Sequence, residues 1–384
     1  MQTEKLYYVN PNLQQFTAQV LSCAPDKGGY RITLDRTAFY PEGGGQACDT
    51  GTLGQARVLD VQEQDAQVYH LCDSPLVVGS TVTGSIDWER RFDLMQQHTG
   101  EHIISGIIHR MFGHGNSGFH VGEQVMEVDF DGPIPADALA QIEQEANEAV
   151  WQDIPLKCWY PDEETLPTVF YRTKRALPWP VRIVQVPGYD SCACCGIHVT
   201  TTGQVGLIKI LSCVKFHQGV RLELVCGKRA YSIMRDVFDQ NKQVSQTFSA
   251  KILETADAAK KASEQLAAEK FRAAALEKKV FSYIADAYHG KENVLHFEPG
   301  LSSGSIRELT DKIAESCTGW AAVYSGTDAM GYGLCIVSKT GDVKALGAKA
   351  AEMLKGRGGG KAGSFQGSFQ TTKDQIEHFF AEYV

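Results

Sequence analysis

Two histidines spaced four residues apart, His98 and His102, constrain the fold of this chain more than any other feature. They lie in the run 91–111, whose apolar spacing predicts an amphipathic helix, and residues four apart share one helical face. About a hundred residues downstream, Cys194 and His198 have the same spacing. Three imidazoles and one thiolate match the ligand preferences of zinc. We therefore expect the fold to bring the two segments together around one Zn²⁺ ion per chain.

Spacing alone leaves the cysteine ligand and the metal open. Cys194 leaves three residues before the downstream histidine, which lets both side chains turn toward one ion, whereas Cys192 and Cys195 remain alternatives. Iron is the main competitor of zinc at such a site. The helix lacks the metalloprotease signature, in which glutamate directly follows the first histidine, because Thr99 occupies that position. Glu101 is interpreted as a helix-surface group or as a support for the ligands.

Composition and charge exclude several classes of protein. The chain has 11 cysteines, an odd number, and lacks the pattern of a secretory signal, so we expect reduced thiols and a cytoplasmic protein. No apolar run is long enough to span a membrane. The net charge of -9 argues against a general nucleic-acid coat, so an RNA partner would have to meet a local cluster of cations.

The order of residue patterns predicts an α+β protein with four parts. Short β-type runs separated by turns predict a small antiparallel β-barrel in 1–90. Helical and alternating patterns predict an α+β metal-binding domain in 91–228. Residues 229–290, rich in Ala, Lys, Glu and Gln and free of proline, predict a helical spacer or coiled coil. A small α/β domain is expected in 291–384.

Two glycine-rich segments are candidates for binding. Gly43, Gly44 and Gly45 precede Gln46, and three glycines let the backbone approach a ligand closely. This segment lacks the Lys-Ser/Thr ending of a nucleotide-binding loop, which excludes ATP. In the C-terminal part we expect a glycine-rich basic loop that cradles nucleic-acid phosphates. Its candidate residues are Lys344, Lys349, Lys355, Arg357, Gly358, Gly359, Gly360 and Lys361.

Several of these segments, taken in order, resemble the alanyl-tRNA editing proteins, which are freestanding relatives of the editing part of alanyl-tRNA synthetase. The resemblance covers nearly the whole chain, and the long helices with the glycine-rich tail resemble the long form of the family. The matching segments are Leu34–Pro41 with the triple glycine and Gln46, Gln97–His102, Cys194–Val199, and Gly219–Arg221 with Gly227. Cys195 and Ile197 depart from the family, which usually has glycine and threonine there.

The resemblance implies hydrolysis of the ester that joins serine, or glycine, to tRNA(Ala). Thr37 and Gln46 are then candidates for a catalytic pocket that reads the aminoacyl group, since a hydroxyl and an amide can hydrogen-bond the hydroxyl of serine. The basic tail would hold the tRNA, and the spacer or the C-terminal domain could pair two chains into a homodimer. Two other readings stay open: a non-catalytic tRNA-binding module with a structural zinc, and a zinc hydrolase of a small-molecule ester or amide.

Overall fold

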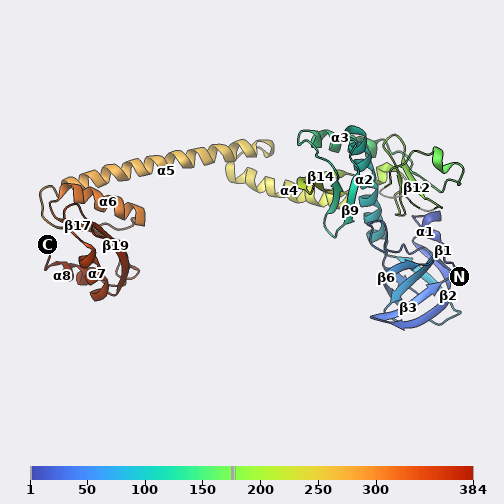
Figure 1. Ribbon diagram of the computed structural model, residues 1–384, viewed down its shortest axis with the longest axis horizontal. Coiled ribbons are helices and arrows are strands. Elements are labelled where there is room, and N and C mark those ends of the chain that lie inside the picture. The colour runs from blue at the N-terminus through green and yellow to red at the C-terminus, as the bar shows by residue number, and fades with distance from the viewer. Residues whose placement is uncertain (1, 174–176, 178, 384) are drawn as a thin grey trace. The chain divides into compact units, whose positions relative to one another are not determined.

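The computed structural model describes residues 2–173, 177 and 179–383. The chain divides into two compact units, Met1–Gln243 and Val244–Val384 (Figure 1). Helices and several sheets are present in both parts of the chain, so the predicted mixed α+β class is confirmed. Among the described helices, none has an apolar stretch long enough to cross a membrane.

Six strands near the N-terminus close into a barrel in the order β2-β3-β7-β6-β5-β8, and every neighbouring pair is antiparallel. Alternate residues of β2, including Phe16, Ala18 and Val20, point into the apolar core of the barrel, which is the pattern that a half-buried strand needs. The elements of this region are β1 (Glu4–Lys5), α1 (Leu6–Val9), β2 (Gln15–Asp26), β3 (Gly29–Leu34), β4 (Arg36–Thr37), β5 (Gly51–Leu53), β6 (Ala56–Gln64), β7 (Gln67–Cys72) and β8 (Thr81–Ile86).

The helix α2 (Trp88–Phe112) is fixed at both its start and its middle. Near its start, the buried guanidinium of Arg91 pairs with the buried carboxylate of Asp49, which ties the helix to the loop after β4. In its middle, the Gln97 side chain exchanges two hydrogen bonds, of 2.8 and 3.0 Å, with the backbone of Cys226. These buried polar contacts set the rotation of the helix and therefore the direction of its histidines.

Two further sheets surround this helix. A four-stranded antiparallel sheet has the order β14-β15-β10-β9, and a three-stranded antiparallel sheet has the order β11-β12-β13. The strand β13 carries Cys192 and ends directly before Cys194. The elements are β9 (Asn116–Val121), β10 (Met126–Phe130), α3 (Ala138–Trp151), β11 (Lys157–Trp159), η1 (Leu166–Thr168), β12 (Ile183–Val186), β13 (Asp190–Ala193), η2 (Thr202–Val205), β14 (Ile208–Phe216) and β15 (Gly219–Cys226).

The long helices predicted for the region after β15 are present. The helix α4 (Gly227–Phe248) follows β15 directly, and the 3₁₀ turn η3 (Ile252–Glu254) precedes α5 (Thr255–Asp286). Most of α4 belongs to the first unit, and α5 belongs to the second.

The second unit is built on a five-stranded sheet of order β16-β17-β18-β20-β19. Alternate residues of β17 serve two cores: Ala321 and Val323 pack with α5 and α6, whereas Ala322 and Tyr324 pack with α7 and α8. Helices therefore cover both faces of the sheet. The elements are β16 (Val294–Phe297), α6 (Ser303–Ser316), β17 (Trp320–Thr327), β18 (Gly331–Ser338), α7 (Lys344–Met353), β19 (Gly356–Lys361), β20 (Ser364–Phe369) and α8 (Lys373–Phe380).

The prediction of a glycine-rich loop in the tail is wrong. Gly358, Gly359, Gly360 and Lys361 belong to β19, which pairs in antiparallel register with β20 along its whole length. A Cβ added at Gly358 would lie 2.6 Å from the ring of Phe365. Glycine is present here because the strand passes close over aromatic rings, and the pairing with β20 satisfies backbone groups that a loop would leave to solvent or ligand.

Candidate metal centre

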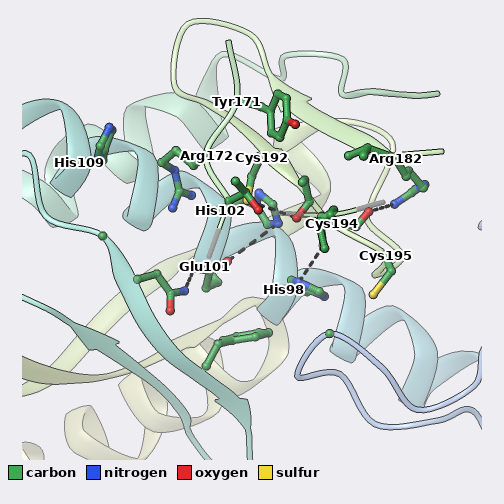
Figure 2. Close-up of a pocket in the computed structure, with 18 of the residues that line it drawn as sticks. His98, Glu101, His102, His109, Tyr171, Arg172, Arg182, Cys192, Cys194 and Cys195 are labelled. Atoms are coloured by element: carbon green, nitrogen blue, oxygen red, sulfur yellow. Dashed lines mark hydrogen bonds and ion pairs between the residues drawn. The ribbon is translucent and has the colours of Figure 1, made fainter. Parts of the chain in front are cut away.

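The four predicted ligands meet in one buried cluster. His98 and His102 come from α2, whereas Cys194 and His198 come from the segment after β13, and their ligand atoms all lie within 4.8 Å of one another. Figure 2 shows three of them, His98, His102 and Cys194. The Sγ atom of Cys194 is 3.4 Å from Nε2 of His98 and 3.6 Å from Nε2 of His198. In a tetrahedral zinc shell the separation of a sulfur and a nitrogen ligand is about 3.5 Å, given Zn–S and Zn–N bonds of about 2.3 and 2.05 Å. The cluster therefore fits a zinc ion in chemistry and in size.

Each histidine of the cluster is oriented by a hydrogen bond on its other ring nitrogen. The Nδ1 contacts are His98 with Gln46 Oε1 at 2.8 Å, His102 with Asp190 Oδ2 at 2.9 Å, and His198 with Thr99 Oγ1 at 3.2 Å. Amide and carboxylate oxygens only accept, so Nδ1 of His98 and His102 carries the proton and Nε2 keeps its lone pair for a metal. Supports of this kind are typical of metal-binding histidines.

The carboxylate of Asp190 is itself held by Arg172. The guanidinium donates two hydrogen bonds, of 2.7 and 2.9 Å, to the two carboxylate oxygens. Although burial opposes ionisation of Asp190, the hydrogen bonds from His102 and Arg172 keep its pKa below the ordinary value.

Sequence reasoning missed both Asp190 and Arg172. The position of Asp190 shortly before Cys194 was a local signal, but Arg172 gave none.

The three neighbouring cysteines occupy different environments. Only Cys194 belongs to the cluster with all three histidines, and although burial opposes thiolate formation, the surrounding imidazoles hold its pKa well below the usual value. Cys192 is close to His102 and Asp190 instead, and burial raises its pKa to about 11. Cys195 is exposed. The geometry thus favours Cys194 over both alternatives.

The segment that carries Cys194 is fixed from the other side. Arg182 donates to the carbonyl oxygens of Cys194 and Gly196 at 3.0 and 2.7 Å, and its guanidinium lies 4.5 Å from the centre of the Tyr8 ring. A Cβ added at Gly196 would lie 2.1 Å from the ring of His98. The close approach of this segment to α2 therefore requires glycine at that position.

The structure treats the two predicted pocket residues differently. Gln46 reaches the cluster through His98, and its Nε2 is buried without a hydrogen-bond partner among the described residues. It follows a tight turn in which Gly44 and Gly45 have φ of 60° and 81°, values that glycine adopts readily. The Thr37 hydroxyl instead contacts Nε2 of His70 at 2.9 Å, and Thr37 is fully buried. Neither Thr37 nor Gln46 lines the cavity beside the cluster, although Gln46 contacts one of the histidines that do.

A cavity of about 800 Å³ opens beside the cluster. His98, His102 and Cys194 form part of its wall, together with the guanidinium groups of Arg172 and Arg182. Aromatic side chains line much of the remainder: Tyr8, Phe119, Tyr160, Phe170 and Tyr171. Aromatic faces suit a nucleobase, and guanidinium groups suit phosphate.

The predicted tail cations lie in the second unit, far along the chain from the cluster. All five are exposed: Lys344 and Lys349 on α7, Lys355 after it, and Arg357 and Lys361 on β19. Arg357 and Lys361 alternate with Gly358 and Gly360 along the strand, so their side chains share one face of the sheet, opposite to the packed glycines. The Lys349 ammonium contacts the hydroxyl of Tyr383 at 2.7 Å.

Comparison with known proteins identifies similar domains and full-length relatives. Residues 6–90 match the family model of tRNA synthetases class II (A), and residues 181–222 match the threonyl and alanyl tRNA synthetase second additional domain. The chain is 30% identical to the alanyl-tRNA editing protein Aarsd1 of Mus musculus, over 92% of this chain and 91% of the relative. The Rattus norvegicus protein of that name is 30% identical, over 97% and 96%. Identity to the alanyl-tRNA editing protein AlaX-L of Pyrococcus horikoshii is 30%, over 61% and 60%.

Proposed function

Because the chain belongs to the alanyl-tRNA editing proteins, we propose that it hydrolyses the ester between a wrong amino acid, serine or glycine, and tRNA(Ala). The observation that carries the proposal is the cluster of His98, His102, Cys194 and His198, because three of its members (His98, His102 and Cys194) line a cavity of about 800 Å³. The four side chains hold one zinc ion. When bound, zinc supplies a Lewis acid that polarises an ester carbonyl or a water molecule.

The chain's own residues prepare the site for this reaction. The contacts of Gln46, Asp190 and Thr99 with the histidines fix the rings before substrate arrives, so no reorganisation is needed during the reaction. The aromatic wall of the cavity stacks with the terminal base of the tRNA, and Arg182 faces the sugar-phosphate chain.

Gln46 distinguishes serine from alanine in this proposal. Its buried Nε2 has no partner among the described residues, and a buried donor of this kind gains most from a substrate group that accepts a hydrogen bond. Alanine lacks such a side-chain group. We propose the same role, recognition of the serine hydroxyl, for Thr37. If a Thr37→Val variant kept its selectivity between seryl and alanyl esters, Thr37 would have no part in this recognition.

The cations on α7 and β19 bind the tRNA body. Contacts to phosphate do not require a concave cradle, because most of the affinity comes from charge and counterion release. Although this segment is a strand and not the predicted loop, Arg357 and Lys361 keep their proposed role in binding phosphate. The glycines are no longer proposed to bind phosphate through their backbone.

Deacylation of Ser-tRNA(Ala) tests the proposed function. The zinc-loaded protein should release serine, and both the His98→Ala variant and the protein treated with a chelator should not. Failure of the intact, zinc-loaded protein would instead support a binding module with a structural zinc. Hydrolysis of a free seryl ester without hydrolysis of the tRNA ester would support a small-molecule hydrolase.

A further inference from the structure

Glu101 is a buried carboxylate at the edge of the candidate metal centre. It lies on α2 directly before His102, has a relative exposure of 4%, and faces the cavity (Figure 2). Among the described residues that line the cavity, it is the only carboxylate. Of the two sequence interpretations of Glu101, a helix-surface group or a support for the ligands, the first is wrong, because the loop and strand that follow α2 cover this side of the helix.

The carboxylate of Glu101 is held in one orientation. Its Oε1 accepts hydrogen bonds from the hydroxyl of Ser105 and from the amide of Asn116. Its Oε2 lies 3.9 Å from Nε2 of His102, which is the histidine nitrogen that faces the cluster. One oxygen is therefore used for positioning, and the other is directed to the space beside the metal centre.

No lysine or arginine among the described residues forms an ion pair with Glu101. Asp190 differs, because Arg172 and His102 already compensate its charge. Arg172 interacts with Glu101 electrostatically, but its guanidinium is already paired with Asp190. A buried carboxylate without a paired cation of its own gains from a cation that binds beside it. The oxygen Oε2, which lies beside the metal centre on a residue that lines the cavity, can therefore accept a hydrogen bond from a cationic ligand there.

The substrate class of the proposed function carries such a charge. An aminoacyl ester has an α-ammonium group separated from the reacting carbonyl carbon by a single carbon atom. A carbonyl placed at the metal centre therefore keeps the ammonium close to that centre, and Glu101 Oε2, 3.9 Å from Nε2 of His102, lies there as well. We propose that Glu101 binds the α-ammonium group and restricts the enzyme to esters with a free α-amine. This inference rests on the proposed function.

A second chemical role for Glu101 makes a different prediction. A general base that takes a proton from water serves every ester, so its loss slows charged and neutral substrates alike. An ammonium-binding carboxylate serves only the charged substrate. The two roles are separated by substrates that differ in the α-amine alone.

The test compares Ser-tRNA(Ala) with its α-hydroxy counterpart, glyceroyl-tRNA(Ala), in which nitrous acid has replaced the amine by a hydroxyl of similar size. Hydrolysis is measured under single-turnover conditions with zinc-loaded protein, and each rate is divided by the uncatalysed rate of the same ester. The unaltered protein should prefer the seryl ester by about ten-fold or more, the size expected for one charge-assisted hydrogen bond. In the Glu101→Gln variant this preference should be lost, with the rate on the α-hydroxy ester unchanged.

The matched control is Glu89→Gln, the same substitution on the same helix at a side chain that is 87% exposed. It should leave the preference unchanged. Zinc content and thermal unfolding of each variant show whether the fold and the metal centre remain intact.

The outcomes separate this inference from the proposed function. Hydrolysis of both esters without a preference in the unaltered protein overturns the role of Glu101 and leaves the editing function standing. An equal loss on both esters in Glu101→Gln overturns it as well and assigns the residue to proton transfer or to support of the metal. If the unaltered protein hydrolyses neither ester, the proposed function fails and the role of Glu101 falls with it.

Discussion

The metal cluster in the first unit and the basic edge in the second, which is the set of exposed cations on and near α7 and β19, are two kinds of candidate binding surface. In the cluster, each ligand is buried or nearly buried and each histidine has a partner that fixes its ring. At the basic edge, the five cations Lys344, Lys349, Lys355, Arg357 and Lys361 are exposed on a helix, a connection and an edge strand. Directed ligand bonds need fixed geometry, whereas attraction to phosphate needs mainly charge. Mutations should therefore have steep and local effects in the first region and shallow, additive effects in the second.

The largest effect is expected from removal of the thiolate. Cys194→Ala should lose most of the bound zinc and slow deacylation by more than the roughly hundred-fold that is typical of residues that only support a ligand. Zinc content by atomic absorption and single-turnover deacylation measure the two quantities. Cys195→Ala is the matched control, because this neighbouring cysteine is exposed and lies outside the cluster. If Cys195→Ala lost its zinc and Cys194→Ala kept it, Cys195 and not Cys194 would be the zinc ligand.

A smaller effect is expected from removal of a supporting carboxylate. Asp190→Asn should weaken zinc binding by about 10- to 100-fold, because the amide no longer fixes His102 as a charged acceptor does. Competition with a chromogenic chelator measures the affinity. Asp129→Asn removes a similar carboxylate, bound by Arg221 through two hydrogen bonds of 2.6 and 2.9 Å, from a place outside the cluster. Equal weakening in both variants would indicate a general loss of stability rather than support of the metal.

The edge strand β19 gives a test of packing. Gly358→Ala should lower the free energy of unfolding of the second unit by about 1–3 kcal/mol, because its Cβ would lie 2.5 Å from the carbonyl oxygen of Gln366 and 2.6 Å from the Phe365 ring. Denaturant unfolding followed by circular dichroism measures the change. Gly359→Ala adds the same methyl group where nothing lies within 4 Å, so it should be nearly neutral. Similar losses in both variants would contradict the strand geometry.

The smallest single effects are expected at the cations. Arg357→Ala or Lys361→Ala should weaken tRNA binding only a few-fold and lower the slope of log affinity against log salt by about 0.7–0.9 for each phosphate that is no longer neutralised. Filter binding at several salt concentrations measures both quantities. Lys312→Ala removes an exposed cation from α6 in the same unit and serves as control. An equal decrease of the slope in all three variants would contradict the proposal, because an exposed cation on α6 would then contribute as much to tRNA binding as the cations on β19.

The comparison also shows which residues of the candidate site could be predicted from the sequence. The spacing of His98, His102, Cys194 and His198 was readable, because a helical repeat and a short segment each place two ligands on one side. Gln46, which contacts His98, was singled out as a candidate through its glycine-rich context. Asp190 and Arg172 were missed, and Glu101 was left between a surface group and a support for the ligands, because their surroundings depend on contacts with segments that are distant in the chain.

The sequence by itself determined the mixed α+β class and the chemical types of the candidate ligands, since these follow from local periodicity and residue chemistry. Only the tertiary structure decided which groups face one another. Pairing with β20 made a strand of the segment expected to be a loop, because ladder hydrogen bonds and packing over Phe365 outweigh the freedom of its glycines. The packing of α2 against β9, β13 and β15 buried Glu101 beside the cluster. Long-range packing and desolvation, which no local pattern encodes, turned four suitable side chains into one site.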